Sequence, residues 1–272
     1  MNDRVLSVRG IEVYVEIQGD VHLPTIVMLH GFTGSTRTWQ EITRRLQGRF
    51  RTIAIDLIGH GKTAKPSELS RYSMDEQIKD LDDVVIQLGL ERFTLLGYSM
   101  GGRTALAYAV GSPEKVEMLI LESTSPGLQG KEERESRKNL DNQLANQIIE
   151  KGLTAFVDRW ENIPLFDSQK ALDEKTRSAI REERLSQSEI GLANSLRGMG
   201  TGCQRSYWSE LDKLDIPVLL ITGEFDKKFV NISREMAAHL PNSVQKTVLG
   251  AGHAIHVEKP DVFATMIEEY IN

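Results

Sequence analysis

The sequence predicts an α/β protein built on a doubly wound, mostly parallel sheet with one helical insertion. Three observations lead to this fold class. Short apolar runs recur along the chain, and such runs are typical of strands buried on both faces of a parallel sheet. Segments with helical periodicity lie between these runs, as a doubly wound sheet requires. One long stretch, residues 125–205, breaks the alternation.

The strand patterns begin near the N-terminus. Residues 5–8 and 11–17 are short β-type stretches, and Arg9-Gly10 between them is a pair typical of a hairpin turn. Compact apolar runs follow, and we expect a buried strand at each of them: residues 25–29, 52–55, 93–96, 116–121 and 218–221. Helical spacing of apolar residues predicts helices at residues 74–88, 105–110 and 262–271.

The break in the alternation suggests the domain organisation. Residues 125–205 are charged, contain Trp160 and show helical pieces without a convincing strand. We expect residues 1–124 and 206–272 to form the core and residues 125–205 to form a helical lid, because a helical insertion at the rim of a sheet is a natural cover for a site. The alternative is a surface elaboration without a function.

Composition limits the possible functions. The chain has 272 residues, 40% apolar content, a net charge of -6 and a pI near 5.6, whereas nucleic-acid-binding proteins are usually basic. Cys203 is the sole cysteine, and residues 1–10 lack the apolar region of a secretory signal. No apolar run approaches the ~18 residues of a membrane span. We therefore expect a monomeric cytoplasmic protein that binds neither nucleic acid nor membrane.

The strongest local signal is Gly97-Tyr98-Ser99-Met100-Gly101. An apolar strand pattern runs directly into this Gly-x-Ser-x-Gly motif and a helix pattern follows it, which is the context of a nucleophile elbow. The sharp strand-to-helix turn of an elbow exposes the serine hydroxyl, and glycines are needed where side chains would collide across the turn. Ser99 is therefore the predicted catalytic serine, and a chance match to the motif is the alternative.

A serine hydroxyl needs a neighbouring histidine to take its proton, and in elbows of this type the chain order is serine, acid, histidine. His253 lies beside glycines in a loop before the last helix, and His256 is its rival. Asp226 closely follows the strand at 218–221 and is the predicted acid, although an acid there is also suited to a helix N-terminus. Glu122, which ends another strand pattern, is the alternative acid.

Two backbone N–H groups are expected to form an oxyanion hole. One belongs to Met100, directly after the serine, and the other to Phe32 in the His-Gly loop that follows residues 25–29. Phe32 also suits a pocket wall through its ring. The sequence predicts no metal and no cofactor, because the histidines are badly spaced for zinc and the glycine-rich residues 56–63 lack phosphate-loop spacing.

Arginines form a second signal. Arg103 follows Ser99 by one helical turn. Charges on a helix usually form a solvated face, but arginine binds carboxylates with a two-pronged fork, so a polycarboxylate substrate would use such residues. The others lie in the insertion: Arg134, Arg137, Arg177, Arg181 and Arg184.

These features together resemble one family of the α/β-hydrolase fold, the 2-succinyl-6-hydroxy-2,4-cyclohexadiene-1-carboxylate synthases of the menaquinone pathway. The resemblance covers nearly the whole chain. It lies in Gly97-Tyr98-Ser99-Met100-Gly101-Gly102-Arg103, Pro126-Gly127-Leu128-Gln129, the segment from Glu133 to Arg137, Gly223-Glu224-Phe225-Asp226 and Ala251-Gly252-His253.

The resemblance implies a lyase that eliminates pyruvate from 2-succinyl-5-enolpyruvyl-6-hydroxy-3-cyclohexene-1-carboxylate without a metal or cofactor. It implies a catalytic triad of Ser99, Asp226 and His253, with Ser99 as the base. It also implies the residues that bind this small polycarboxylate: Arg103, Arg137, Arg184, Tyr98 and Trp160. The insertion is less similar around Arg184 and Trp160, and Arg181 or Trp208 are the alternative matches to them.

Two other functions stay open on the sequence. A serine ester hydrolase or carbon–carbon bond hydrolase of the same fold would use the same triad and would not need three arginines in its pocket. A non-catalytic binding protein of this fold would tolerate the loss of a triad residue, and all three are present here.

Overall fold

The computed structural model describes residues 2–271, and within them the strands form one sheet in the order β1-β2-β4-β3-β5-β6-β7-β8. The pairs β1–β2 and β2–β4 are antiparallel and every other pair is parallel, which confirms the predicted mostly parallel sheet. The strands are β1 (Asn2–Val8), β2 (Ile11–Gln18), β3 (Thr25–Leu29), β4 (Arg51–Ile55), β5 (Phe93–Tyr98), β6 (Val116–Glu122), β7 (Val218–Gly223) and β8 (Ser243–Val248).

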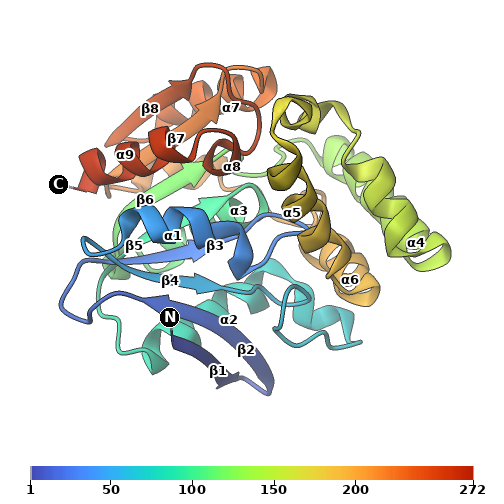
Figure 1. Cartoon of the computed structure of the whole chain (residues 1–272), viewed down its shortest axis with the longest axis horizontal. Coiled ribbons are helices and arrows are strands. Elements are labelled where there is room, and N and C mark those ends of the chain that lie inside the picture. Colours follow the sequence, from blue (N-terminus) through green and yellow to red (C-terminus); the bar gives the residue numbers. More distant parts are fainter. Residues whose placement is uncertain (1, 272) are drawn as a thin grey trace.

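Helices cover both faces of the sheet (Figure 1). The helices α2 (Met74–Gln87), α3 (Met100–Gly111) and α7 (Lys227–His239) share a buried core with one set of strand residues, including Val27 and Leu29 of β3. The helices α1 (Gln40–Leu46), α8 (Ile255–Glu258) and α9 (Pro260–Ile271) share another core with the alternate set, including Ile26 and Met28. Successive side chains of a strand point to opposite faces of the sheet, so a strand that is covered on both faces needs a continuous apolar run.

Short 3-10 helices occupy several connections. They are η1 (Thr36–Trp39), η2 (Leu69–Tyr72), η3 (Pro113–Lys115), η4 (Pro164–Ala171) and η5 (Trp208–Lys213). None of the helices within residues 2–271 has both the length and the apolar character needed to cross a membrane.

Every apolar run named from the sequence forms a strand, whereas β8 has no such run. β8 lies at the edge of the sheet and several of its side chains are exposed, so its sequence needs little apolar content. The helix expected at residues 105–110 begins earlier, at Met100, because Gly101 of the elbow and the Gly102 that follows it also belong to α3.

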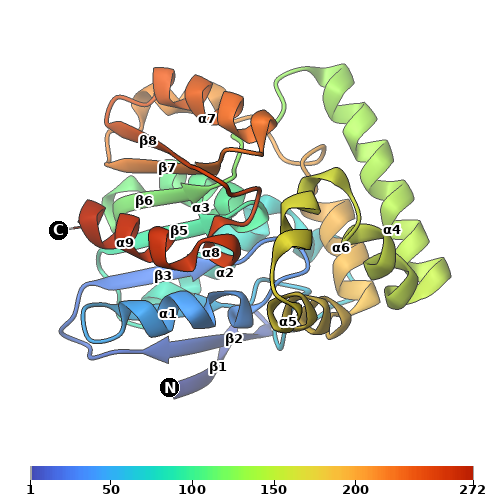
Figure 2. The same cartoon turned by 45° about the horizontal axis from the view of Figure 1, so that its top comes forward.

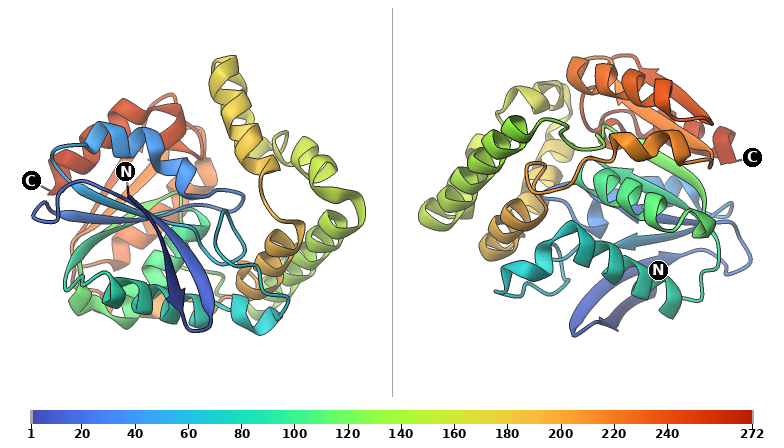
Figure 3. Two further views of the ribbon diagram at one scale, coloured as in Figure 1. Left: turned by 60° about the horizontal axis from the view of Figure 1, so that its bottom comes forward. Right: turned by 180° about the vertical axis from the view of Figure 1, so that it is seen from behind.

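Residues 125–205 contain no strand and hold the helices α4 (Lys131–Trp160), α5 (Glu174–Leu185) and α6 (Glu189–Met199). α4 bends at Gly152, whose φ of 81° favours glycine. Figures 1 and 2 place the three helices together beside one end of the sheet, and Figure 3 shows them set off from the helices that cover its faces. Phe32, in the loop after β3, packs against the small apolar core between α4 and α6, so the insertion meets the carboxyl ends of the central strands.

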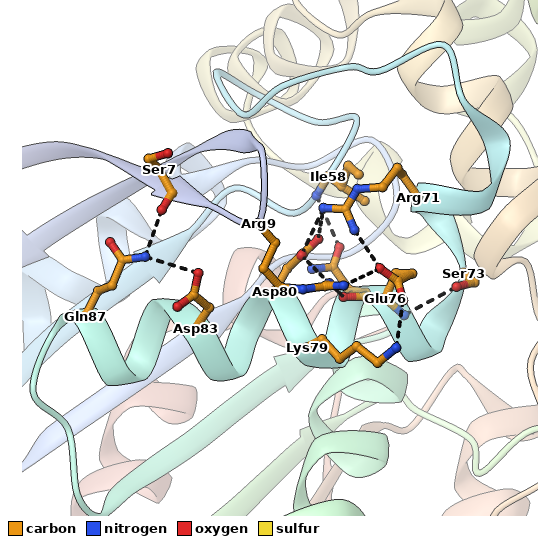
Figure 4. Close-up of polar contacts among 11 residues, drawn as sticks. Ser7, Arg9, Ile58, Arg71, Ser73, Glu76, Lys79, Asp80, Asp83 and Gln87 are labelled. Carbon is orange, nitrogen blue, oxygen red and sulfur yellow. Dashed lines mark hydrogen bonds and ion pairs between the residues drawn. The ribbon is translucent and has the colours of Figure 1, made fainter.

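A cluster of ion pairs fastens the N-terminal hairpin to α2 (Figure 4). Arg9, in the β1–β2 turn, donates to Asp80 at 2.8 Å and to Glu76 at 2.6 Å. Arg71 donates to the same carboxylates, at 3.0 Å and 2.7 Å. Hydrogen bonds from Lys79 and Arg9 lower the pKa of Glu76 to about 2, whereas burial raises the pKa of Asp80. The cluster therefore ties the antiparallel edge of the sheet to a helix that covers it.

Candidate active site

Ser99 occupies a tight turn between β5 and α3. Its backbone has φ 50° and ψ -105°, a conformation that costs free energy and persists only where the surroundings enforce it. A Cβ atom on Gly97 would lie 2.5 Å from the carbonyl oxygen of Gly101, and a Cβ atom on Gly101 would lie 2.2 Å from that of Leu29. Glycine at both positions is therefore what permits the turn.

Three side chains meet at this turn in a hydrogen-bonded series. His253 Nε2 lies 3.1 Å from Ser99 Oγ, and His253 Nδ1 lies 2.6 Å from Asp226 Oδ2. The Asp226 carboxylate favours the tautomer with the proton on Nδ1, so that Nε2 can accept from the Ser99 hydroxyl. Such a series can remove a proton from Ser99 and return it later.

Asp226 also caps a helix. Its other oxygen, Oδ1, accepts from the backbone N–H of Phe229 at 3.3 Å, at the start of α7. The two interpretations offered by the sequence, triad acid and helix N-terminal acid, are therefore compatible because each uses a different oxygen.

The two alternatives from the sequence, Glu122 and His256, pair with each other. His256 Nδ1 lies 2.9 Å and 2.8 Å from the two Glu122 oxygens. Both side chains are buried. Among residues 2–271, the carboxylate that bonds His253 is Asp226 and not Glu122.

Ser99 lies on the wall of a cavity of about 480 Å³, called the Ser99 cavity below. The helical insertion supplies part of its lining, for example Leu144 and Leu196, and the core supplies His253 and Phe229. Most of the site residues expected from the sequence lie on this cavity: Phe32, Tyr98, Ser99, Met100, Arg103, Arg137, Trp160 and His253.

Arg103 gives this cavity a buried positive charge. The residue is 8% exposed, and its Nη1 donates to the carbonyl oxygen of Met199 at 2.8 Å and to Gln204 Oε1 at 2.6 Å. Burial, helped by the charge of Arg137, lowers the pKa of Arg103 to about 10, so the group is still protonated at neutral pH. Within residues 2–271 no carboxylate forms an ion pair with Arg103, whereas Arg137 pairs with Asp141 at 2.9 Å. An anionic ligand would compensate this charge.

Arg184 lies on a different cavity, of about 740 Å³, next to the first one. It is 7% exposed, stacks over Phe166 at 4.7 Å and donates to Gln169 at 3.2 Å. Phe32, Tyr98 and Phe166 line both cavities and so form an aromatic wall between them. The three arginines expected from the resemblance therefore do not share one cavity.

The alternatives to Arg184 and Trp160 have partners of their own. Arg181 forms ion pairs with Asp158 and Glu161, at 2.5 Å and 2.6 Å. Trp208 also lines the Ser99 cavity, but its indole N–H donates to the carbonyl oxygen of Gly127 at 3.0 Å.

Trp160 lines the same cavity and has a buried donor without a partner. Its ring packs edge-on against Phe32, with 5.5 Å between the ring centroids. Its indole nitrogen is buried and has no hydrogen-bond partner among residues 2–271. A buried N–H without an acceptor costs free energy, so a ligand oxygen at this position would be favoured.

The two expected oxyanion donors are also free. No backbone carbonyl among residues 2–271 accepts from the N–H of Phe32 or Met100, and Met100 is the first residue of α3, where helical N–H groups lack partners. His30 holds the Phe32 loop, because its Nε2 accepts from the N–H of Leu57 at 3.0 Å. Burial lowers the pKa of His30 to about 3 and so keeps this acceptor neutral.

Several residues around His253 were not expected from the sequence. The rings of Phe229 and Phe166 lie 4.8 Å and 6.2 Å from the imidazole, centroid to centroid. Glu258 accepts from the N–H of Gly252 at 2.6 Å. Phe229 had a usable signal, since it follows Asp226 by one helical turn; Phe166 and Glu258 had none, because their positions depend on how distant segments fold together.

No group of three or more His, Cys, Asp or Glu side chains within residues 2–271 is arranged to hold a metal ion. His253 and His256 bond to different carboxylates, Asp226 and Glu122.

Sequence comparisons place the chain among known proteins. The family model described as alpha/beta hydrolase fold matches residues 24–260. A protein of Bacillus subtilis (strain 168), provisionally named as a 2-succinyl-6-hydroxy-2,4-cyclohexadiene-1-carboxylate synthase, is 47% identical over 96% of this chain and 95% of that protein. The synthase of the same name from Enterobacter sp. (strain 638) is 30% identical, and the match covers 93% of each chain.

Solved structures agree with this placement. The structure of MenH from S. aureus superposes with a TM-score of 0.91 at 37% identity, over 94% of this chain and 97% of that chain. An enol-lactonase from Burkholderia xenovorans LB400, at 21% identity and a TM-score of 0.86, shows the shared fold alone. The chain therefore belongs to the α/β-hydrolase-fold family and, within it, to the family of 2-succinyl-6-hydroxy-2,4-cyclohexadiene-1-carboxylate synthases.

Proposed function

We propose that the protein is a lyase of the menaquinone pathway that eliminates pyruvate from 2-succinyl-5-enolpyruvyl-6-hydroxy-3-cyclohexene-1-carboxylate to give 2-succinyl-6-hydroxy-2,4-cyclohexadiene-1-carboxylate. One observation carries the proposal beyond the fold. The cavity that holds the Ser99–His253–Asp226 series also holds Arg103, a buried cation without a carboxylate partner among residues 2–271. An enzyme for small neutral esters needs the series and has no use for the cation. Membership of the synthase family supports the same reaction.

The cavity suits the substrate in size and chemistry. Its volume of about 480 Å³ lies in the ordinary range for small-molecule sites. Arg103 and Arg137 would each bind a substrate carboxylate, and the indole N–H of Trp160 would donate to a further oxygen. Tyr98 would form the floor of the site. Arg184 belongs to the proposal as a third carboxylate ligand, which it can become only if the aromatic wall between the two cavities opens.

Proton removal starts the proposed reaction. The ring C–H next to the succinyl carbonyl is acidic, and Ser99, deprotonated with the help of His253, takes this proton as the general base. As Ser99 Oγ takes the ring proton, its own hydroxyl proton passes to His253 Nε2, which lies 3.1 Å away. Asp226 stabilises the imidazolium that results, because its Oδ2 accepts a hydrogen bond from the N–H of His253 Nδ1, with 2.6 Å between the two heavy atoms.

The electrons of the broken C–H bond move first onto the succinyl carbonyl oxygen. The N–H groups of Phe32 and Met100 would hold this enolate oxygen. The enolate then collapses, the ring double bond shifts, and the carbon–oxygen bond to the enolpyruvyl group breaks. The leaving enolpyruvate takes back one proton and becomes pyruvate, and the ring is left as the diene.

A serine ester hydrolase or carbon–carbon bond hydrolase is the second candidate. The hydrogen-bonded series favours it equally, since the same groups would let Ser99 attack an acyl carbon. The two candidates differ in what Arg103 contributes, because only a charged substrate needs a guanidinium in the wall.

The direct test is to add the enolpyruvyl substrate to the purified protein and to follow pyruvate in real time. The proposal expects catalytic release that Ser99→Ala abolishes and that Ser209→Ala, a change at an exposed serine, leaves unchanged. No pyruvate from the intact protein would overturn the lyase, and ester cleavage dependent on Ser99 would then establish the hydrolase.

The proposal includes a monomeric cytoplasmic enzyme that binds neither nucleic acid nor membrane. The acidic composition supports the part that concerns nucleic acid, because proteins that bind it are usually basic. Light scattering on the purified protein measures the mass and would reveal an oligomer.

A further inference from the structure

A second buried acid–imidazole pair, Glu122 with His256, lies close to the first and has no part in the proposed reaction. The exposed fractions of these residues are 0% and 2%. Both Glu122 oxygens lie within 2.9 Å of His256 Nδ1, and Oε1 also accepts from the backbone N–H of His256 at 3.1 Å. A buried carboxylate with these donors holds the partner segment in one position, because losing the bonds would leave a charge without compensation.

Glu122 also touches the nucleophile elbow. It is the last residue of β6, and its carbonyl oxygen accepts from the backbone N–H of Ser99 at 2.9 Å. Glu122 therefore bonds to the turn that carries Ser99 through its backbone carbonyl, and to His256, three residues after His253, through its side chain. The distance between the serine and the histidine depends on both of these attachments.

The ring of Tyr98 lies between the two histidines. Its centroid is 4.6 Å from that of His256 and 5.4 Å from that of His253. Tyr98 lines the Ser99 cavity, whereas His256 lines the neighbouring one. His256 can therefore support the Tyr98 ring from the side that the substrate does not reach.

A second carboxylate anchors the other side of the histidine segment. Glu258 accepts from the N–H of Gly252 at 2.6 Å and from that of Ala254 at 3.4 Å, and these two residues flank His253. With Glu122 on His256, the backbone around His253 is thus attached to buried carboxylates on both sides.

We propose that Glu122 is a positioning residue: through His256 it fixes the backbone that carries His253 and the ring of Tyr98. This inference rests on the roles proposed above for His253 and Tyr98. Its physical basis is that catalysis depends steeply on alignment, so that a displacement of about 1 Å can cost roughly a hundredfold in rate. Glu122 itself does not need to touch the substrate.

Three variants separate the bonds from the ring. Glu122→Ala removes both bonds to His256, and we expect kcat to fall about tenfold to a hundredfold with little change in KM. Glu122→Gln keeps an acceptor oxygen, and we expect it to recover most of kcat. His256→Asn keeps a donor for Glu122 and removes the ring against Tyr98, so KM should rise while kcat is largely retained.

Asp80→Asn is the matched control, because Asp80 is also a carboxylate buried to 1% exposure and lies in the ion-pair cluster of Figure 4. It should lose stability with kcat and KM unchanged. If folded Glu122→Ala and His256→Asn keep the wild-type kcat and KM, the pair is merely structural and the proposal is overturned. If Glu122→Ala does not fold, Glu122→Gln and His256→Asn decide the question by the same criteria.

A measurement without substrate keeps this proposal separate from the proposed function. His253 Nδ1 and Asp226 Oδ2 lie 2.6 Å apart, and the proton between them should give a far-downfield proton NMR signal. We expect Glu122→Ala to shift or broaden that signal and Asp80→Asn to leave it in place. An intact protein that releases no pyruvate refutes the lyase, whereas an unchanged signal in every Glu122 and His256 variant refutes the positioning role.

Discussion

Replacing Arg103 with alanine removes a buried positive charge from the wall of the Ser99 cavity. In the intact protein Arg103 is 8% exposed, and within residues 2–271 its guanidinium donates to a carbonyl and an amide but to no carboxylate. The lyase proposal has a substrate carboxylate as the missing partner. The ester-hydrolase alternative has no group to place there.

The expected loss follows from that bond. A hydrogen bond between charged groups contributes about 1.5–3 kcal/mol, and each 1.36 kcal/mol corresponds to about a factor of ten in rate. Arg103→Ala should therefore lower kcat/KM for pyruvate release by roughly tenfold to a hundredfold. Two effects on stability oppose each other, since Met199 and Gln204 lose a donor while an uncompensated buried charge disappears. Thermal unfolding of the variant measures their balance separately.

The assay compares two reactions of the same variant: pyruvate release from the enolpyruvyl substrate and cleavage of a small neutral ester. Arg159→Ala, an exposed arginine of α4 that does not line the cavity, is the control for loss of charge alone. We expect Arg103→Ala to impair the first reaction far more than the second, and Arg159→Ala to impair neither. Equal losses in both reactions would refute the carboxylate role, make Arg103 a structural residue and favour the hydrolase.

Three further predictions concern the triad, the ion-pair cluster and a buried carboxylate. Ser99→Ala should lower kcat by about a thousandfold or more with an unchanged melting temperature, and near-normal turnover would end the proposed mechanism. Asp80→Ala should destabilise the fold by about 1–3 kcal/mol in urea unfolding, because Arg9 and Arg71 lose a buried acceptor; a change below measurement error would mean that the cluster contributes nothing. Burial raises the pKa of Asp56 to about 6, so between about pH 4 and 6 the folded state holds a proton that the unfolded state has lost. The free energy of unfolding therefore declines as pH rises through this range, at up to about 1.4 kcal/mol per pH unit. Asp56→Asn should remove that decline from stability curves measured across this range, and an identical pH dependence in the variant would contradict the assignment.

The buried Asp56 carboxylate connects two loops near the active site. Its two oxygens accept from the backbone N–H groups of Thr36 and Lys62, at 2.6 Å and 2.7 Å. These bonds join the loop that carries Phe32 to the glycine-rich residues 56–63. The glycine-rich segment, which lacks the spacing of a phosphate loop, therefore has a structural use: a Cβ atom on Gly61 would lie 2.1 Å from Asp56 Oδ2, so glycine there is what lets the loop close around the carboxylate.

Local patterns in the sequence were enough to predict the central strands, the parallel sheet and the elbow at Ser99. A buried strand needs an unbroken apolar run, and the elbow needs glycines at fixed offsets, so both leave a signature within ten residues or so of chain. β8 escaped prediction because an edge strand with exposed side chains needs no such run.

Only the tertiary structure decided how the polar residues pair. The sequence offered two acids and two histidines for one triad. The fold pairs Asp226 with His253 and Glu122 with His256, and the residues of the second pair are 134 positions apart in the chain. It also placed Arg103 and Arg137 on the Ser99 cavity and Arg184 behind an aromatic wall, although the resemblance had grouped the three arginines as substrate ligands. The physical reason is that strand and helix patterns arise between near neighbours in the chain, whereas the direction of a side chain at the end of a strand, and the group it meets, depend on how the whole sheet and the insertion pack together.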